Sequence, residues 1–356
     1  MSYTQEEFDK IVEWKSLGLS SRKICDKLGW DRTRKSTVNQ VYNRFLLICS
    51  EKPKGLLESP KLEAQVWAEP LPASSYQASG YQVDGIPTSI LETSGYNPNG
   101  VNILYWDLET SPEEAYVWGR WKQNVADCQV KRYSHILTCS YAFNDGTPVG
   151  VKLSPEDVQN EDDLTAVVDM VLAINHADVI VTFNGKKFDL KYLKTRMLKW
   201  GLPPLKPVKH IDLFEQAKRH FRFPSNSVDN ICKYLGFSQL KIKTDFDLWK
   251  RCLSTNDNIS SIALEEMNIY CKGDIEVTRN LHKQMSGWVT GTNIGTIANY
   301  KQPENNTLRC KCGSDDIQPE QGFHYTSMNG FQLYRCGSCR GVTRINIKGD
   351  KLVEVV

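Results

Sequence analysis

The feature that most constrains the fold is a nearly continuous apolar run at residues 101–108, which reads V-N-I-L-Y-W-D-L. A strand that is apolar on both sides has to be covered on both faces, which is typical of a central strand in a sheet flanked by helices. Further strand patterns follow at residues 115–119, 135–143, 149–153, 179–183 and 208–213, and a helical pattern at 161–175. We therefore expect an α/β fold for residues 101–290, with a mixed sheet that is partly antiparallel and partly parallel, and flanking helices.

Two acids, Asp107 and Glu109, lie at the end of this apolar run. Side chains two residues apart on a strand point to the same face, so both carboxylates are expected to meet at one point. Burying two neighbouring carboxylates is costly unless cations neutralise them, and Mg²⁺ or Mn²⁺ prefers oxygen ligands of this kind. A strand end with both acids in solvent is the alternative.

The regions that flank this domain differ from it in composition. Six of the fifteen prolines fall within residues 51–100, where apolar periodicity is weak, so this region is expected to be a flexible linker. Residues 1–50 show three short helical patterns, and residues 291–356 combine short strands and turns. The chain is therefore expected to have an N-terminal helical unit, a linker, a main domain and a small C-terminal unit.

The N-terminal helices resemble a helix-turn-helix DNA-binding unit. A turn containing Gly29 separates the second helical pattern from a third one with a polar face. The third helix would contact DNA through amide and guanidinium groups suited to base edges and phosphates. The residues expected to do so are Arg34, Lys35, Asn39, Gln40 and Arg44. A three-helix bundle that binds another protein is the alternative.

Two further acids lie at positions that suit a site in an α/β sheet. Asp189 follows the strand pattern at 179–183, where the chain turns into a helix, and the carboxyl ends of strands are the usual place for such sites. Asp274 belongs to a late helical pattern, where Tyr270 is four residues earlier and therefore on the same helical face. A tyrosine hydroxyl beside a metal-bound carboxylate could orient a water molecule.

Three segments in this order resemble the motifs of DEDD-type 3′–5′ exonucleases: W-D-L-E-T, N-G-K-K-F-D-L-K-Y-L and Y-C-K-G-D. The tyrosine subgroup matches, because the histidine subgroup would place His at position 269, which is Ile. The segments H-I-D-L-F and S-V-D-N-I-C-K-Y-L-G are similar to the proofreading domain of family B DNA polymerases. The resemblance covers about 190 residues and implies a ribonuclease H-like fold, with no room left for a polymerase domain.

This resemblance implies a role for each motif residue. Asp107, Glu109 and Asp274 would bind two Mg²⁺ or Mn²⁺ ions, with Asp189 holding the second ion through water. Tyr270 would position the attacking water in an in-line displacement. Contacts to nucleic acid would come from the segment N-G-K-K-F-D-L-K-Y-L. The residues expected to make them are Asn184, Lys186, Lys187 and Phe188. For Asn184 and Phe188, a polar turn residue and a core aromatic are the alternatives.

Local charge supports a nucleic-acid partner. The whole chain has a net charge of only +2, but residues 186–222 contain eleven Lys and Arg against three acids. A local excess of eight positive charges suits a polyanion, although a solvated basic face would have the same composition. We expect DNA rather than RNA as the partner.

Four of the eleven cysteines are clustered near the C-terminus: Cys310, Cys312, Cys336 and Cys339. Four thiolates can complete a tetrahedral structural zinc site, and the pattern resembles a zinc ribbon, although the first pair is C-x-C rather than the more usual C-x-x-C. A small tail with little apolar content needs such a metal to fold. The odd cysteine count and the polar first thirty residues favour reduced thiols in a cytoplasmic compartment.

We therefore expect a metal-dependent 3′–5′ exonuclease with two Mg²⁺ or Mn²⁺ ions and one structural Zn²⁺. A structure-selective endonuclease or an RNA-trimming nuclease could use the same carboxylates. A DNA-binding regulatory protein with a vestigial nuclease site is a further alternative, which the presence of all four acids and the tyrosine disfavours. No apolar stretch approaches the roughly 20 residues that cross a bilayer, so no membrane partner is expected.

Overall fold

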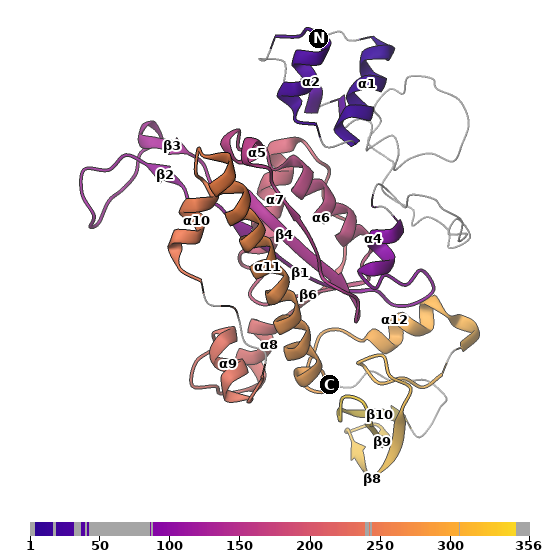
Figure 1. Ribbon diagram of the computed structural model, residues 1–356. Coiled ribbons are helices and arrows are strands. Elements are labelled where there is room, and N and C mark those ends of the chain that lie inside the picture. Colours follow the sequence, from indigo (N-terminus) through magenta and orange to yellow (C-terminus); the bar gives the residue numbers. More distant parts are fainter. Residues whose placement is uncertain are drawn as a thin grey trace.

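The computed structural model describes residues 4–16, 19–31, 37–39, 41–42, 86, 88–238, 242, 244–305 and 307–346. At its centre is a five-stranded sheet with the order β5-β4-β1-β6-β7 (Figure 1). The strands are β1 (Ile103–Thr110), β4 (Ile136–Phe143), β5 (Val149–Lys152), β6 (Val179–Thr182) and β7 (Lys209–Asp212). β4 is antiparallel to β1 and β5, whereas β6 is parallel to β1 and β7. The expected mixed α/β sheet with flanking helices is confirmed.

β1 is the middle strand, and its apolar side chains belong to two clusters, to both of which α11 contributes. Leu104, Trp106 and Leu108 are buried in one apolar cluster with residues of α6 (Leu164–His176) and α7 (Asp189–Trp200). Tyr105 points to the other face and belongs to a second cluster with residues of α8 (Leu213–His220) and α11 (Asp257–Met285). Coverage on both faces explains why this strand is apolar on both sides.

The helix α11 runs diagonally across one face of the sheet and contacts β1, β4 and β5 (Figure 1). It is 29 residues long and begins after Asn256, whose side chain accepts hydrogen bonds from the amides of Asn258 and Ile259. Shorter helices complete the domain: α5 (Pro155–Gln159), α9 (Val228–Tyr234), α10 (Phe246–Cys252) and α12 (Ile294–Lys301). Among the helices described, none combines the length and the apolar character needed to cross a membrane.

The N-terminal unit has a small core of its own. Its helices α1 (Gln5–Ser16) and α2 (Ser21–Leu28) pack with residues 37–39 and 41–42, which are also helical. The buried residues of this core are Ile11, Ile24, Cys25, Val38 and Val41. Ser20 begins α2 by accepting a hydrogen bond from the amide of Lys23, and its hydroxyl donates to Glu156 of α5 at 2.9 Å. The unit therefore contacts the main domain.

The expected flexible linker does not extend to residue 100. Ile86 and Leu91 are fully buried in the core of the main domain, and α4 (Thr88–Thr93) precedes β1. The carbonyl oxygen of Ser94 accepts a hydrogen bond from the amide of Phe143 at 2.6 Å, which attaches this segment to the end of β4. Ile86 and residues 88–100 therefore belong to the main domain, while residues 51–85 lie outside the described part of the chain.

Two smaller sheets lie outside the main sheet. The C-terminal unit is an antiparallel sheet of β8 (Ile317–Tyr325), β9 (Gly330–Cys336) and β10 (Val342–Asn346), reached through η4 (Pro303–Asn305). A two-stranded ribbon consists of β2 (Glu114–Ala115) and β3 (Val130–Arg132), with η3 (Asp127–Gln129) leading into β3. The expected strand at residues 115–119 is wrong beyond position 115, because residues 116–128 are all exposed and contact no sheet that would extend it.

Candidate active site and cysteine cluster

Three of the predicted acids converge at the end of β1. Asp107 and Glu109 lie on the same face of the strand, and α11 places Asp274 opposite them. Each of the three residues offers a carboxylate oxygen, and these oxygens all lie within 4.8 Å of one another. Oxygens that coordinate one divalent ion at about 2.0–2.6 Å lie at separations in this range. The three carboxylates therefore fit a hard divalent cation.

Asp189 lies beside this cluster and is buried. It is the first residue of α7, and its carboxyl group accepts a hydrogen bond from the Leu108 amide and lies within hydrogen-bonding reach of the Asp107 side chain, with which it would share a proton. The Leu108 amide is accessible because β1 pairs with β6 only over Ile103–Tyr105 and extends beyond it. Burial raises the pKa of Asp189 to about 6, and these hydrogen bonds reduce the effect. A carboxyl that is protonated this easily beside other acids is one that a bound cation would stabilise in its charged form.

Tyr270 lies one helical turn before Asp274 on α11 and is almost fully buried. Its ring packs edge-on against Trp249 of α10, with 6.2 Å between the ring centroids. On the same helix, the Cys271 thiol lies 3.7 Å from the carbonyl oxygen of Asp107. These contacts fix α11 against β1, so Tyr270 and Asp274 are held next to the acids of the strand.

The loop between β6 and α7 is held by Asp212, whose role the sequence did not reveal. Asp212, at the end of β7, is buried, and its carboxylate accepts hydrogen bonds from the amides of Asn184 and Lys186 at 2.9 and 3.0 Å. The same carboxylate accepts from the Phe214 amide and thereby caps α8. Asn184 has a positive φ of 66°, as a tight turn between β6 and α7 requires. Asp212 therefore positions the loop that leads to Asp189.

The other residues predicted to contact nucleic acid before α7 lie at the surface of the protein. Lys186 forms an ion pair with Glu215 at 2.6 Å, which lowers the pKa of Glu215. The ammonium group of Lys187 lies 5.9 Å from the ring centre of Phe214. Phe188 is 48% exposed and its ring stacks on that of Tyr192, so it is not a core aromatic. Phe188 and Lys187 thus remain accessible to a ligand next to Asp189.

A hollow of about 290 Å³ lies where β1 ends. It is lined by Thr110 and Ser111, directly after Glu109, and by Phe246 and Trp249 of α10. Trp249 also contacts Tyr270, so a residue that lines the hollow packs against the helix that carries Asp274. Sequence reasoning missed these aromatic residues, because α10 comes more than 130 residues after β1 and only the fold brings them together.

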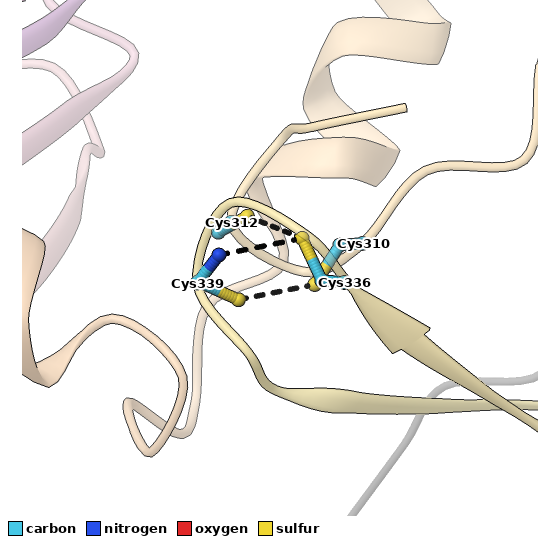
Figure 2. Close-up of side chains that lie close together, drawn as sticks. All are labelled: Cys310, Cys312, Cys336 and Cys339. Atoms are coloured by element: carbon cyan, nitrogen blue, oxygen red, sulfur yellow. Dashed lines mark hydrogen bonds between the residues drawn. The ribbon is translucent and has the colours of Figure 1, made fainter. Parts of the chain in front are cut away.

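The four cysteines form a compact cluster that suits one zinc ion (Figure 2). Cys310 and Cys339 have their sulfurs 3.5 Å apart, and those of Cys312 and Cys336 are 3.7 Å apart. A disulfide would bring two sulfurs to about 2.05 Å, so these are free thiols. Four sulfurs at about 2.3 Å from a tetrahedral zinc lie about 3.8 Å from each other. The C-x-C spacing of the first pair is therefore compatible with zinc.

Hydrogen bonds within the cluster favour the thiolate form of Cys310. Contacts from the Cys312 and Cys339 thiols lower the pKa of Cys310, and the same contacts raise the pKa values of Cys312 and Cys339. The amide of Cys339 points at the sulfur of Cys336 at 3.5 Å (Figure 2), and the amide of Gly341 points at the sulfur of Cys339 at 3.3 Å. Such amide–sulfur contacts stabilise thiolates that bind a metal.

The cysteine cluster is packed closely against the chain that follows α11. A Cβ atom added to Gly287 would lie 2.4 Å from the carbonyl oxygen of Cys339, and one added to Gly295 would lie 2.4 Å from that of Cys310. The amide of Ile294 also donates to the carbonyl oxygen of Lys311 at 2.8 Å. Both halves of the cluster therefore contact backbone of the main domain.

The N-terminal prediction needs one correction. Asn39 was expected to face DNA, but it is 6% exposed and accepts a hydrogen bond from the Ser21 hydroxyl at 2.5 Å. A buried amide is most stable with such a partner, so Asn39 joins α2 to the next helix. Arg34, Lys35, Gln40 and Arg44 lie outside the described residues, and their binding to DNA stays a prediction.

The basic segment at residues 186–222 is also partly structural. Arg196 is buried and forms hydrogen bonds of 2.6 and 2.8 Å with both carboxylate oxygens of Asp163. Lys186 is paired with Glu215 as described above. The remaining cations of this segment are exposed: Lys187, Lys191, Lys194, Lys199, Lys206, Lys209, Lys218, Arg219 and Arg222. The exposed positive charge is therefore smaller than the sequence count indicates.

Comparison with known proteins agrees with this architecture. Residues 130–286 match the family model described as the RNase H superfamily. The main domain has a ribonuclease H-like fold. The matched residues include Asp189, Tyr270 and Asp274 and begin after Asp107 and Glu109, which the structure adds to the site.

A solved family B DNA polymerase, from the hyperthermophilic archaeon Pyrobaculum calidifontis, is similar to this chain. The similarity covers 64% of this chain and 31% of the polymerase chain, with 15% sequence identity and a TM-score of 0.39. This chain therefore spans less than a third of that polymerase. None of the curated proteins matches this chain.

Proposed function

We propose that this protein is a metal-dependent nuclease that removes nucleotides from the 3′ end of nucleic acid, with DNA as the favoured substrate. The observation that carries the proposal is the convergence of Asp107, Glu109 and Asp274 within 4.8 Å, next to the buried Asp189. These acids come from β1, α7 and α11, which are far apart in the sequence. Four acids gathered at one point destabilise a fold unless a cation neutralises them, so their arrangement favours a metal-dependent reaction.

The donor set fits divalent metal ions, and the residues that would hold them can be named. Asp107, Glu109 and Asp274 would be the direct ligands, and Asp189 would hold a second ion through water. Two such ions, when bound, activate a water molecule and stabilise the leaving 3′-oxygen of a phosphodiester. Carboxylate oxygens suit Mg²⁺ and Mn²⁺ better than softer metals.

Tyr270 is proposed to orient the attacking water molecule. Tyr270 is held by the edge-on contact with Trp249 and lies one turn from Asp274. Its hydroxyl is proposed to hydrogen-bond the attacking water and to hold it in line with the scissile bond. Because the ring is packed, the hydroxyl loses little freedom when substrate binds.

The hollow beside Glu109 supports cleavage at the end of a nucleic-acid strand. Its volume of about 290 Å³ is at the lower limit of small-molecule sites and could hold one nucleotide unit. Phe246 and Trp249 offer aromatic faces on which a base could stack. A terminal nucleotide bound there would place its phosphodiester near the acid cluster, and this favours an exonuclease over an endonuclease.

We further propose that the cysteine cluster binds one structural zinc ion. The sulfur separations of 3.5 and 3.7 Å, together with the amides aimed at the sulfurs, support this proposal. Zinc would join the chain before β8 to the turn between β9 and β10.

Cleavage of end-labelled substrates tests the proposed activity. Purified protein is incubated with Mg²⁺ or Mn²⁺ and with 5′-labelled single-stranded DNA, duplex DNA or RNA of the same sequence. An exonuclease acting from the 3′ end gives a ladder of labelled products that shortens with time. Discrete internal products would indicate an endonuclease instead, faster degradation of RNA would indicate an RNA-trimming enzyme, and no cleavage in any arm would refute the nuclease proposal.

A further inference from the structure

The loop between β2 and β3 exposes several aromatic side chains. We refer to residues 116–126 of this loop as the aromatic arm. Within it, Trp118 is 100% exposed, Trp121 is 86% exposed and Tyr116 is 70% exposed. Figure 1 shows the arm extending away from the body of the main domain. Exposed tryptophan is costly because a large apolar surface stays in water, so two such residues in one loop indicate a binding surface.

The aromatic arm has an ordered shape, which the side chain of Gln129 maintains. Its amide group donates to the carbonyl oxygen of Tyr116 at 2.9 Å, and its oxygen accepts from the amide of Ala126 at 3.0 Å. The two ends of the arm are therefore tied together. Gln123 adds a hydrogen bond of 2.7 Å to the carbonyl oxygen of Trp121.

The base of the arm is anchored to the domain by charge. Glu114 forms ion pairs with Lys131 and Arg132 at 3.3 and 3.5 Å. Arg132 also donates to Gln159 of α5 at 2.9 Å, and Gln159 donates to carbonyl oxygens that follow α10. The arm is thus presented from a fixed base.

The charge of the aromatic arm indicates the chemistry of its partner. Arg120 and Lys122 are interleaved with the two tryptophans, and the arm contains no acid. Both cations are exposed, and neither forms an ion pair with the described residues, whereas the cations at the base are paired with Glu114. Rings that stack on bases, alternating with cations that neutralise phosphates, are typical of surfaces that bind single strands. An apolar protein partner would not require these two cations.

The arm is also close to the acid cluster along the chain. Trp118 follows Glu109 by nine residues, so the two lie at most about 30 Å apart at 3.3 Å per residue. A stacked strand rises about 3.4 Å per nucleotide, so about nine nucleotides cover this distance. A strand of about nine nucleotides whose 3′ end occupies the acid cluster is therefore long enough to reach the arm.

We propose that the aromatic arm binds single-stranded nucleic acid upstream of the cleaved end, through base stacking on Trp118 and Trp121 and phosphate contacts to Arg120 and Lys122. This inference rests on the proposed nuclease function and assigns a second binding site for the same substrate. It makes binding depend on strand length, because a strand too short to extend from the acid cluster to the arm gains nothing from the arm.

Binding of short and long strands tests the proposal. The full-length protein is titrated into 5′-fluorescein-labelled dT4 and dT20 with Ca²⁺ in place of Mg²⁺, which keeps a divalent ion at the acid cluster while slowing cleavage, and fluorescence anisotropy gives the Kd. The double variant Trp118→Ala/Trp121→Ala should bind dT20 at least tenfold more weakly, since each stacked base contributes roughly 5- to 150-fold. Its affinity for dT4 should be unchanged. The variant Arg120→Gln/Lys122→Gln should lower the slope of log Kd against log salt by about 1.4 for dT20.

A matched control comes from the C-terminal sheet. Tyr325 is also 70% exposed, but the β8–β9 loop near it carries no cation. Tyr325→Ala should bind dT20 like the wild type. Both arm residues are exposed, so their replacement leaves the fold intact, and thermal denaturation verifies this. If the double variant binds dT20 like the wild type while the wild type still binds and cleaves it, the arm proposal is wrong and the nuclease proposal stands. If the wild type binds and cleaves no nucleic acid, both fail.

Discussion

The acid cluster and the cysteine cluster both suit metal ions, but they are built in opposite ways. The acid cluster brings together Asp107 and Asp274, which are far apart in the chain, through a central strand and a 29-residue helix. The cysteine cluster lies within residues 310–339 and is formed by local turns. The acid cluster lies in a domain that is stabilised by two large apolar clusters.

The C-terminal sheet has no comparable core. Among the described residues of β8, β9 and β10, Phe331 is the one large apolar side chain that is buried. A sheet of this size gains too little from burial to offset its ordering entropy, so a metal has to contribute. At the acid cluster a metal would take part in a reaction on a domain that has its own core. At the cysteine cluster a metal would stabilise the fold itself.

The largest expected effect is the loss of activity when an acid is removed. Asp274→Asn should reduce cleavage by at least 10²–10³-fold, because one metal ligand and its charge are lost. The free energy of unfolding without metal should stay the same or rise, since repulsion between buried acids decreases. Cleavage assays and urea denaturation in EDTA measure the two effects. A rate equal to that of the wild type would mean that these acids do not bind the catalytic metal.

Removal of one cysteine should disrupt the C-terminal sheet and leave the cleavage activity in place. Elemental analysis should find about one zinc per chain in the wild type and none in Cys336→Ser, because three thiolates bind zinc far more weakly. The C-terminal sheet should lose its order, as limited proteolysis would show. Cleavage of dT4 should persist, since the acid cluster is supported by its own core. A zinc-free protein with a protease-resistant tail would contradict the structural role.

Tyr270→Phe should have a smaller effect on the rate than Asp274→Asn. It removes a hydroxyl that orients water and leaves every metal ligand in place, so we expect kcat to fall roughly ten- to hundredfold with little change in KM. The Phe ring keeps the contact with Trp249, so the structure should be preserved. Steady-state kinetics measure both parameters, and an equal loss in kcat for Tyr270→Phe and Asp274→Asn would assign the tyrosine a larger role.

The smallest effect concerns pH and stability without metal. The pKa of Asp189 is about 6 in the folded protein and 3.8 ordinarily, so its contribution to stability is complete below pH 4 and is lost as the pH rises through 6. Wild-type protein in EDTA should lose about 1 kcal/mol from this group between pH 5 and pH 8, since one pKa unit corresponds to about 1.4 kcal/mol.

Comparison with a variant isolates this contribution. Asp189→Asn should lose less stability between pH 5 and pH 8 in urea denaturation. Asp169, whose pKa burial also raises to about 6, contributes equally to both proteins. The same pH dependence in wild type and variant would show that Asp189 is not the group responsible. Saturating Mg²⁺ should reduce the difference, because the cation favours the charged carboxylate.

The parts that the sequence predicted depend on neighbouring residues. The spacing of Asp107 and Glu109 on a strand, and of Tyr270 and Asp274 on a helix, fixed their common faces before the fold was known. The mixed sheet followed from apolar periodicity in the same way. Short strands and turns were also expected near the C-terminus, where residues 326–329 join β8 to β9.

The parts that the sequence did not predict depend on distant residues. Asp212 accepts hydrogen bonds from a loop 26–28 positions earlier, and no local pattern marks such a partner. Asn39 has the composition of a DNA-reading residue but meets Ser21 in the folded unit. Ile86 and Leu91 lie within the proline-rich region of residues 51–100, so their burial against the main domain could not be recognised from composition. In each case a tertiary contact decided the role of a polar or apolar side chain.

The two glycines beneath the cysteine cluster have a consequence for how this protein can change over evolutionary time. Gly287 and Gly295 leave no room for a side chain as long as the carbonyls of Cys339 and Cys310 lie against them. A substitution at either position therefore has to occur together with a change in the tail. A lineage that lost the tail would be released from this restriction, and larger residues should accumulate at both positions. The two glycines would then record whether an ancestor carried the cysteine cluster.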